Sequence, residues 1–251
     1  MTRPVIRSLE AVGNLVTLTG STLLWTIRPP YRIGQTLLAM EFIGVQSVFI
    51  VSLTGVFSGM VLALQTVYSL RQFSAEGVVG SVVAISLTRE LSPVFASLMV
   101  TARAGSAMAA EIGNMRVTEQ IDALTTMGVS PVQYLLSPRL VGSVCMVPLL
   151  CVLFSCVGMA GSWVVAVEGL GVDPGIFIAN IEKYLKPMDF WMGEIKAVAF
   201  GFLMSVICCH QGYFTSGGAR GVGQATTRAV VYTAVAILVA NYFITSVLTE
   251  G

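Results

Sequence analysis

Arg89 and Glu90 are two charged residues in a long apolar run, and their position requires a chemical explanation. They stand side by side near the middle of the run 77–102, which carries no other charge. A charge at the centre of a membrane-spanning helix costs about 3 kcal/mol on insertion scales, so such residues face a cavity, a water path or a partner. Adjacent helical residues point about 100° apart, and at least one of the two therefore needs a partner from elsewhere.

Two interpretations of this pair stay open. Arg89 and Glu90 could form a polar spot in a substrate pathway, or they could belong to an ion-pair network that only fixes helix packing. Lys196, near the start of a later apolar run, offers a second cationic point for such a pathway. The alternative for Lys196 is a side chain that extends to the membrane interface.

The residue sets needed for other chemistry are missing from the sequence. His210 is the single histidine, and the five cysteines include no Cys-x-x-Cys pair, so we predict neither a metal site nor a catalytic residue. Ser58 has no neighbouring base that would activate it. No glycine-rich loop ends in Lys-Ser or Lys-Thr, so we expect this chain to bind no cofactor and any ATP and Mg²⁺ to be held by a partner.

The composition indicates an integral membrane protein. Apolar residues make up 55% of the 251 residues and charged residues only 11%, which is too few to cover a soluble globule. The net charge of +1 gives no field that would attract nucleic acid. Long runs nearly free of charge predict one all-α membrane domain over 1–251 with five transmembrane helices, at 42–68, 77–102, 140–167, 192–216 and 228–249.

The first 28 residues differ from these spans. Polar residues recur there every three or four positions, which predicts an amphipathic helix over 1–28 lying in the membrane surface and ending at Pro29-Pro30. Basic residues place the N-terminus in the cytoplasm, because nine arginines fall on that side and four basic residues on the other. The loop 168–191 and the C-terminus are then expected outside.

Small residues predict where helices approach closely. Gly55 and Gly59 form a G-x-x-x-G pair in the first span, which permits tight contact with another helix or subunit. An apolar stripe runs next to them and either packs against a neighbour or lines an apolar cavity; it consists of Val56, Met60, Leu64 and Val67.

The segment 104–130 is the least membrane-like part of the chain. Its charged residues predict a short polar helix on the cytoplasmic side that ends at Gly128; they are Glu111, Arg116, Glu119 and Asp122. Such a helix between two spans is either a solvated loop or the element that a motor subunit contacts.

Several motifs resemble one family in the same order over nearly the whole chain. They are GVFSGMVLAL at 55–64, SLTRELSP at 86–93, ARAGSAMAAEIG at 102–113, RVTEQ at 116–120, MGVSP at 127–131, SPR at 137–139 and GVGQATTRAV at 221–230. Together they are similar to the MlaE (YrbE) permeases.

The resemblance implies the permease subunit of an ATP-binding-cassette (ABC) transporter that moves phospholipids between the bacterial inner membrane and the outer envelope. It also implies a homodimer enclosing a lipid cavity, a cytoplasmic ATPase dimer and a periplasmic hexamer of MCE-domain chains with membrane anchors. In some such systems a STAS-domain protein is added.

By the same resemblance, Arg89, Glu90 and Lys196 belong to the lipid cavity, and Glu111 to Asp122 form the helix that couples to the ATPase. Thr226, Thr227 and Arg228 are expected at the cytoplasmic start of the last span, where they either cap that helix or contact anionic headgroups through Arg228. Two other classes remain: an ATP-independent channel or secondary transporter, and a structural membrane scaffold.

Overall fold

Five helical segments of the chain are long and apolar enough to cross a membrane. The computed structural model describes residues 2–29 and 32–250, and the side chains of residues 13–29 and 32–248. The five segments are Ile33–Arg71, Glu76–Val117, Val132–Gly169, Pro187–Tyr213 and Gly218–Leu248. The described residues form no strand. The prediction of an all-α membrane protein with five spans is therefore confirmed.

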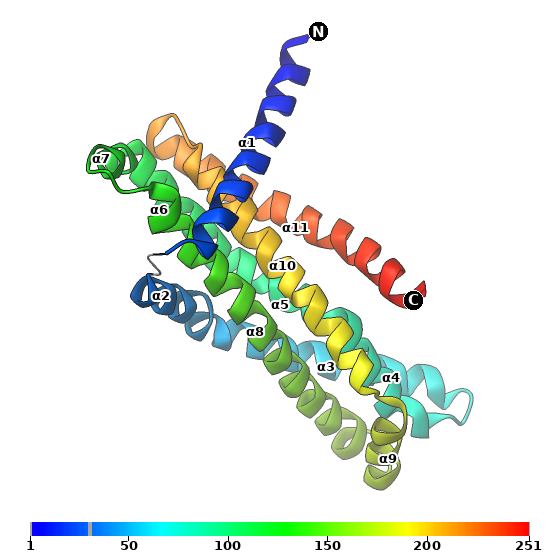
Figure 1. Cartoon of the computed structure of the whole chain (residues 1–251). Helices are drawn as coiled ribbons and strands as arrows, with labels where there is room; N and C mark the ends of the chain where they lie inside the picture. The colour runs from blue at the N-terminus through cyan, green and yellow to red at the C-terminus, as the bar shows by residue number, and fades with distance from the viewer. Residues whose placement is uncertain (1, 30–31, 251) are drawn as a thin grey trace. The chain divides into compact units, whose positions relative to one another are not determined.

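Three of the five segments are built from more than one helical element. Figure 1 labels the α-helices along the chain. The α-helices are α1 (Thr2–Ile27), α2 (Ile33–Ile43), α3 (Val48–Arg71), α4 (Val79–Ser86), α5 (Ser92–Val100), α6 (Ser106–Val117), α7 (Gln120–Thr126), α8 (Ser137–Trp163), α9 (Pro174–Tyr184), α10 (Pro187–Tyr213) and α11 (Gly218–Glu250). Short 3-10 turns are η1 (Val45–Ser47) and η2 (Glu76–Val78), and π-helical turns are η3 (Leu87–Leu91), η4 (Thr101–Gly105), η5 (Val132–Leu136) and η6 (Val164–Gly169).

The last helix begins ten residues earlier than the predicted span 228–249. Gly217 and Gly218 have positive φ angles of 91° and 68°, and α11 starts there because helical hydrogen bonding continues through polar residues. Thr226 and Thr227 lie inside α11 and donate to the carbonyls of Val222 and Gly223 at 2.8 and 3.1 Å. The expectation that these threonines cap the helix is therefore wrong.

Helix α1 covers nearly all of the segment predicted as an interfacial helix. The side chains of residues 2–12 of α1, which carry much of the predicted polar face, lie outside the described side chains. Leu18 of α1 is 8% exposed and belongs to an apolar cluster with Ile112, Ile121, Leu135 and Leu136. The placement of α1 in the membrane surface stays a prediction.

The chain packs as two compact units. Unit 1 is drawn from Met1–Val45, Thr101–Met146 and Gly201–Ile237, and unit 2 from Gln46–Val100, Val147–Phe200 and Leu238–Gly251. In unit 2, α9 packs on α4, and Asp173 caps α9 by accepting a hydrogen bond from the Ile176 N–H at 2.9 Å. Pro174 follows Asp173 as the first residue of α9, a position that proline favours.

Candidate functional site

Arg89 and Glu90 lie on η3, a π-helical turn that the sequence itself explains. In an α-helix the carbonyl of residue 89 would accept the N–H of residue 93, and Pro93 has no N–H to donate. The ladder shifts by one residue here, with the Ser92 N–H bonded to the Leu87 carbonyl. The Arg89 carbonyl is therefore released from α-helical pairing inside a membrane-spanning segment, where it needs another donor.

Lys196 of α10 supplies that donor. Its side chain is 2% exposed, and its Nζ donates to the Arg89 carbonyl at 3.0 Å and to Glu90 Oε1 at 2.7 Å. Gly193 permits the approach, because a Cβ at this position would lie 2.3 Å from the Thr88 carbonyl oxygen. One helical turn separates Gly193 from Lys196, so the close contact directs the ammonium group at η3.

The second oxygen of Glu90 is held by the last helix. Asn241 Nδ2 lies 3.3 Å and Thr245 Oγ1 3.5 Å from Glu90 Oε2. These two residues are four apart and therefore share one face of α11. Even with these partners, 40% of the Glu90 side chain is exposed in the isolated chain. Glu90 is thus a charged group that is held in place and still accessible.

Arg89 points to the start of α10. Its Nε lies 3.7 Å from Asp189 Oδ1, and the other oxygen of Asp189 accepts the Lys186 N–H at 2.8 Å, at the start of α10. We call Arg89, Glu90, Asp189 and Lys196 the charged cluster. Its two positive and two negative side chains balance, which lowers the cost of placing them in a membrane-spanning region.

The glycine pair of α3 lies against α8. A Cβ on Gly59 would be 1.9 Å from the Gly158 carbonyl oxygen, and one on Gly55 would be 2.8 Å from Val157 Cγ2. The buried face of α3 recurs every four residues, at Val51, Gly55, Gly59, Ala63 and Val67. These helices meet backbone to backbone.

The apolar stripe predicted beside the glycines does not hold together as one surface. Val67 is fully buried on the glycine face, Val56 and Met60 are half-buried, and Leu64 is 43% exposed. A groove of about 400 Å³ in unit 2 is lined instead by Phe57, Ser58, Val61, Leu62, Gln65, Leu91 and Phe95. Val67 continues the buried series of Gly55 and Gly59, because α3 buries every fourth residue. The assignment of the stripe to a lipid cavity stays a prediction.

The residues predicted for ATPase coupling fall on two helices rather than one. Glu119 has a φ of 58° and breaks the chain between α6 and α7, while Gly128, with a φ of 74°, follows the end of α7. Arg116 Nη1 lies 2.6 Å from Asp122 Oδ1 and ties α6 to α7 across the break. Both side chains are more than a third exposed, so the pair lies on an accessible surface.

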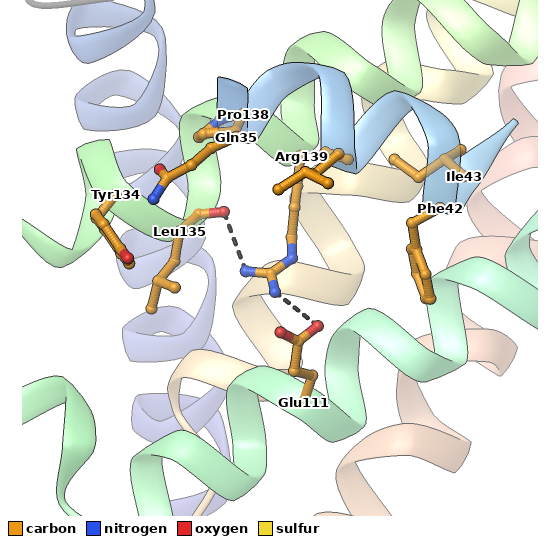
Figure 2. A pocket seen from close by; sticks show the side chains of 10 residues that line it. Gln35, Phe42, Ile43, Glu111, Tyr134, Leu135, Pro138 and Arg139 are labelled. Carbon is orange, nitrogen blue, oxygen red and sulfur yellow. Dashed lines mark hydrogen bonds and ion pairs between the residues drawn. The ribbon is translucent and has the colours of Figure 1, made fainter. Parts of the chain in front are cut away.

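Glu111 faces the chain's own α8. Figure 2 shows its carboxylate beside the guanidinium of Arg139, with Glu111 Oε2 2.7 Å from Arg139 Nη2. Arg139 is 12% exposed on its side chain and also donates to the Leu135 carbonyl at 3.1 Å. The pair lines a cavity of about 310 Å³ together with residues of α2 such as Gln35 and Phe42.

Comparisons with known proteins agree with this architecture. The model of the family described as "Permease MlaE" matches residues 36–247. The chain belongs to the MlaE permease family.

Curated relatives cover most of the chain. A probable ABC transporter permease protein of Rickettsia conorii is 41% identical over 240 residues, which is 96% of this chain and 93% of that protein. The intermembrane phospholipid transport system permease protein MlaE of Haemophilus influenzae is 40% identical over 210 residues, or 83% and 80% of the two chains. The chloroplastic protein TRIGALACTOSYLDIACYLGLYCEROL 1 of Arabidopsis thaliana is 36% identical over 92% of this chain and 66% of its own.

Sequence reasoning missed three members of this MlaE-family site. Asn241 and Thr245 carried a usable signal, because polar residues four apart in an uncharged span mark an interhelical hydrogen-bonding face. Asp189 precedes its span by sequence and looks like a loop residue. Only the approach of α10 to η3 brings its carboxylate to Arg89.

Proposed function

We propose that this chain is the permease subunit of an ATP-driven transporter that moves phospholipids between the inner membrane and the outer envelope. One observation carries the proposal: the charged cluster holds Glu90 in place from two other helices, yet leaves 40% of its side chain exposed in a membrane-spanning segment. A carboxylate that is held in place and still accessible in a membrane-spanning segment can contact a polar headgroup. The relatives support the same class, since they are named as a probable ABC transporter permease and a phospholipid transport system permease.

The lipid cavity is proposed to form between two copies of the chain. Most of the outward side chains of α11 are apolar and exposed in the single chain, including Val235, Leu238 and Tyr242. The accessible side of Glu90 and Arg89 then offers charges that can contact a headgroup, while the groove at Phe57 and Val61 accommodates acyl chains. Homodimerisation is supported by this apolar surface and by the family resemblance.

The free energy is proposed to come from a separate ATPase dimer that binds ATP and Mg²⁺. The Arg116–Asp122 pair and the break at Glu119 give this chain a rigid, mixed-charge surface for that contact. ATP binding would draw the two cytoplasmic surfaces together, compress the lipid cavity and push a phospholipid toward or from the periplasmic partners. The ion pair between Glu111 of α6 and Arg139 of α8 would hold α6 in place during this contact.

The same proposal places the chain in a bacterial inner membrane with the N-terminus in the cytoplasm and the C-terminus in the periplasm. A hexamer of MCE-domain chains with membrane anchors would receive or deliver the lipid on the periplasmic side. A STAS-domain protein would bind on the cytoplasmic side in systems that contain one.

Purification of the full chain from its native membrane in mild detergent tests the class of transporter. We expect an ATPase and an MCE-domain chain to co-elute with it, and the reconstituted complex to transfer fluorescent phospholipid only when ATP is added. Transfer without ATP would favour a secondary transporter or channel, and absence of transfer by an intact, ATP-hydrolysing complex would favour a scaffold.

A further inference from the structure

A second groove lies in unit 1, on residues that do not belong to the charged cluster. It has a volume of about 380 Å³ and is bounded by the end of α1, the start of α2 and the start of α8. Its lining includes Trp25, Arg32, Ile33, Leu37, Gln133 and Val141. The volume lies within the range of small-molecule sites, about 300–1,000 Å³.

The groove lies where two spans begin. Ile33 is the first residue of one membrane-spanning segment and Val132 the first of another, so both put this end of the groove at the level of the lipid headgroups. Trp25 is half-buried at its edge, and tryptophan is enriched at this depth. Ile33 and Leu37 are 67% and 60% exposed and continue the groove as an apolar surface toward the bilayer core.

The charge in the groove is unbalanced. Arg32 is the one charged residue among those that line it, and it makes no ion pair within the described part of the chain. Its Nε is buried and has no hydrogen-bond partner among the described residues. The guanidinium carbon lies 4.6 Å from the centre of the Tyr134 ring, which holds the side chain in place.

Helix α2 adds further donors at the same point. Arg32 is its N-cap residue and makes no side-chain cap, so the first N–H groups of α2 have no side-chain acceptor from that position. An anion beside Arg32 would therefore meet a positive side chain and the positive end of an eleven-residue helix.

The cavity on the opposite face of α2 makes a useful contrast. Gln35, Ala39 and Phe42 line that cavity, and helical spacing puts them opposite Ile33 and Leu37. Its arginine, Arg139, is already paired with Glu111 at 2.7 Å, as Figure 2 shows. One face of α2 therefore borders an arginine paired with a carboxylate, and the other an arginine that has no counter-ion among the described residues.

We propose that the groove at Arg32 binds an anionic phospholipid of the surrounding membrane, with its phosphate at Arg32 and its acyl chains along Ile33, Leu37 and Val141. An ammonium-bearing headgroup gains less, because none of the described residues that line the groove carries a carboxylate to receive it. This site goes beyond the proposed transport function, since it anchors the entry to two spans in the headgroup layer and needs no ATPase.

Trp25 provides the probe for a direct test. The full chain with Trp163→Phe and Trp191→Phe keeps Trp25 as its one tryptophan and is reconstituted into nanodiscs with brominated phosphatidylglycerol or brominated phosphatidylethanolamine. We expect phosphatidylglycerol to quench Trp25 at about fivefold lower mole fraction, the ratio that one basic residue near the surface provides. Arg32→Gln should abolish this ratio, and the matched Arg220→Gln, which removes an exposed arginine elsewhere, should retain it.

Equal quenching by the two lipids, or an unchanged ratio in Arg32→Gln, would overturn the proposal. Millimolar inorganic phosphate separates a lipid site from a plain phosphate site, because a lipid site predicts no relief of quenching. Trp163 packs edge-on against Phe177, with ring centroids 5.5 Å apart, and Trp163→Phe removes part of this contact. A second measurement therefore keeps all three tryptophans. It compares by mass spectrometry the phosphatidylglycerol retained by the unmodified chain and by Arg32→Gln. Equal retention would also count against the site.

Discussion

Gly193 of α10 lies directly against the backbone carbonyl of Thr88, at a place where a Cβ would come within 2.3 Å of the oxygen. This contact brings a helix to the π-helical turn at Leu87–Leu91 and lets Lys196 reach the Arg89 carbonyl and the Glu90 carboxylate. The charged cluster therefore depends on one missing side chain as well as on the four charges.

Gly193→Ala should disturb the whole cluster. The added methyl group meets a backbone oxygen that cannot rotate away, so α10 must shift, and we expect a loss of about 1–3 kcal/mol in stability. Thermal unfolding in detergent measures the loss. Gly20→Ala, whose Cβ would have no atom within 4 Å, is the matched control and should unfold like the wild type. Equal melting of the two variants would contradict the tight contact.

The two partners of the Lys196–Glu90 pair should respond unequally. Glu90→Gln leaves the ammonium of Lys196, 2% exposed, without its counter-ion, and breaking a buried pair in this way costs about 3–5 kcal/mol. Lys196→Met leaves Glu90, which is 40% exposed and keeps Asn241 and Thr245 as donors. We expect Glu90→Gln to melt at the lower temperature and the double variant to recover part of the loss. The reverse order would refute the asymmetry.

Gly59→Ala should destabilise the chain more than Gly55→Ala. A Cβ at Gly59 would lie 1.9 Å from the Gly158 carbonyl oxygen, which is backbone, whereas the nearest atom to a Cβ at Gly55 is the Val157 Cγ2 side-chain methyl. Overpacking against backbone costs about 1–3 kcal/mol, and a side chain can rotate to relieve part of that cost. Denaturation of both variants in the same detergent gives the order, and equal stabilities would contradict it.

Substitutions in the Arg116–Asp122 pair and in the Glu111–Arg139 pair should affect different properties of the complex. Asp122→Asn weakens an exposed pair with Arg116, worth about 0–1 kcal/mol, so the chain should stay stable while lipid-stimulated ATP hydrolysis by the complex falls. Glu111→Gln leaves Arg139, 12% exposed, without its carboxylate and should lower stability first. Melting temperature and ATPase rate, measured on both variants, distinguish the roles. A loss of stability in Asp122→Asn but not in Glu111→Gln would contradict this assignment of roles.

The spans were predictable because the bilayer restricts composition so strongly. Runs without charge located all five segments, but the first begins at Ile33 rather than 42 and the last at Gly218 rather than 228. Apolar length sets the part of a helix that lies in lipid, while hydrogen bonding lets the helix continue beyond it. This is why Thr226 and Thr227, read from sequence as caps, lie within α11.

The charged cluster was predictable only in part. Arg89 and Glu90 stand out in sequence because charge is rare in a span, but their partners are set by packing across the chain. Lys196 is 106 residues from Glu90 in sequence, and Asp189 reaches Arg89 only through the helix start at Lys186. Pro93 accounts for the π-helical turn, which releases the Arg89 carbonyl. That Lys196 donates to this carbonyl depends on the packing of α10 and could not be predicted from the sequence.

Arg89→Gln gives the most direct test that the charged cluster forms part of the lipid path. The Arg89–Asp189 contact is long, at 3.7 Å, and without it the carboxylate of Asp189 still accepts the Lys186 N–H at 2.8 Å, so the variant should fold. In proteoliposomes that contain the complete complex, we expect ATP-dependent phospholipid transfer to fall at least about tenfold, a change of about 1.4 kcal/mol, while basal ATP hydrolysis and melting temperature stay near wild type. Transfer at the wild-type rate would contradict the account.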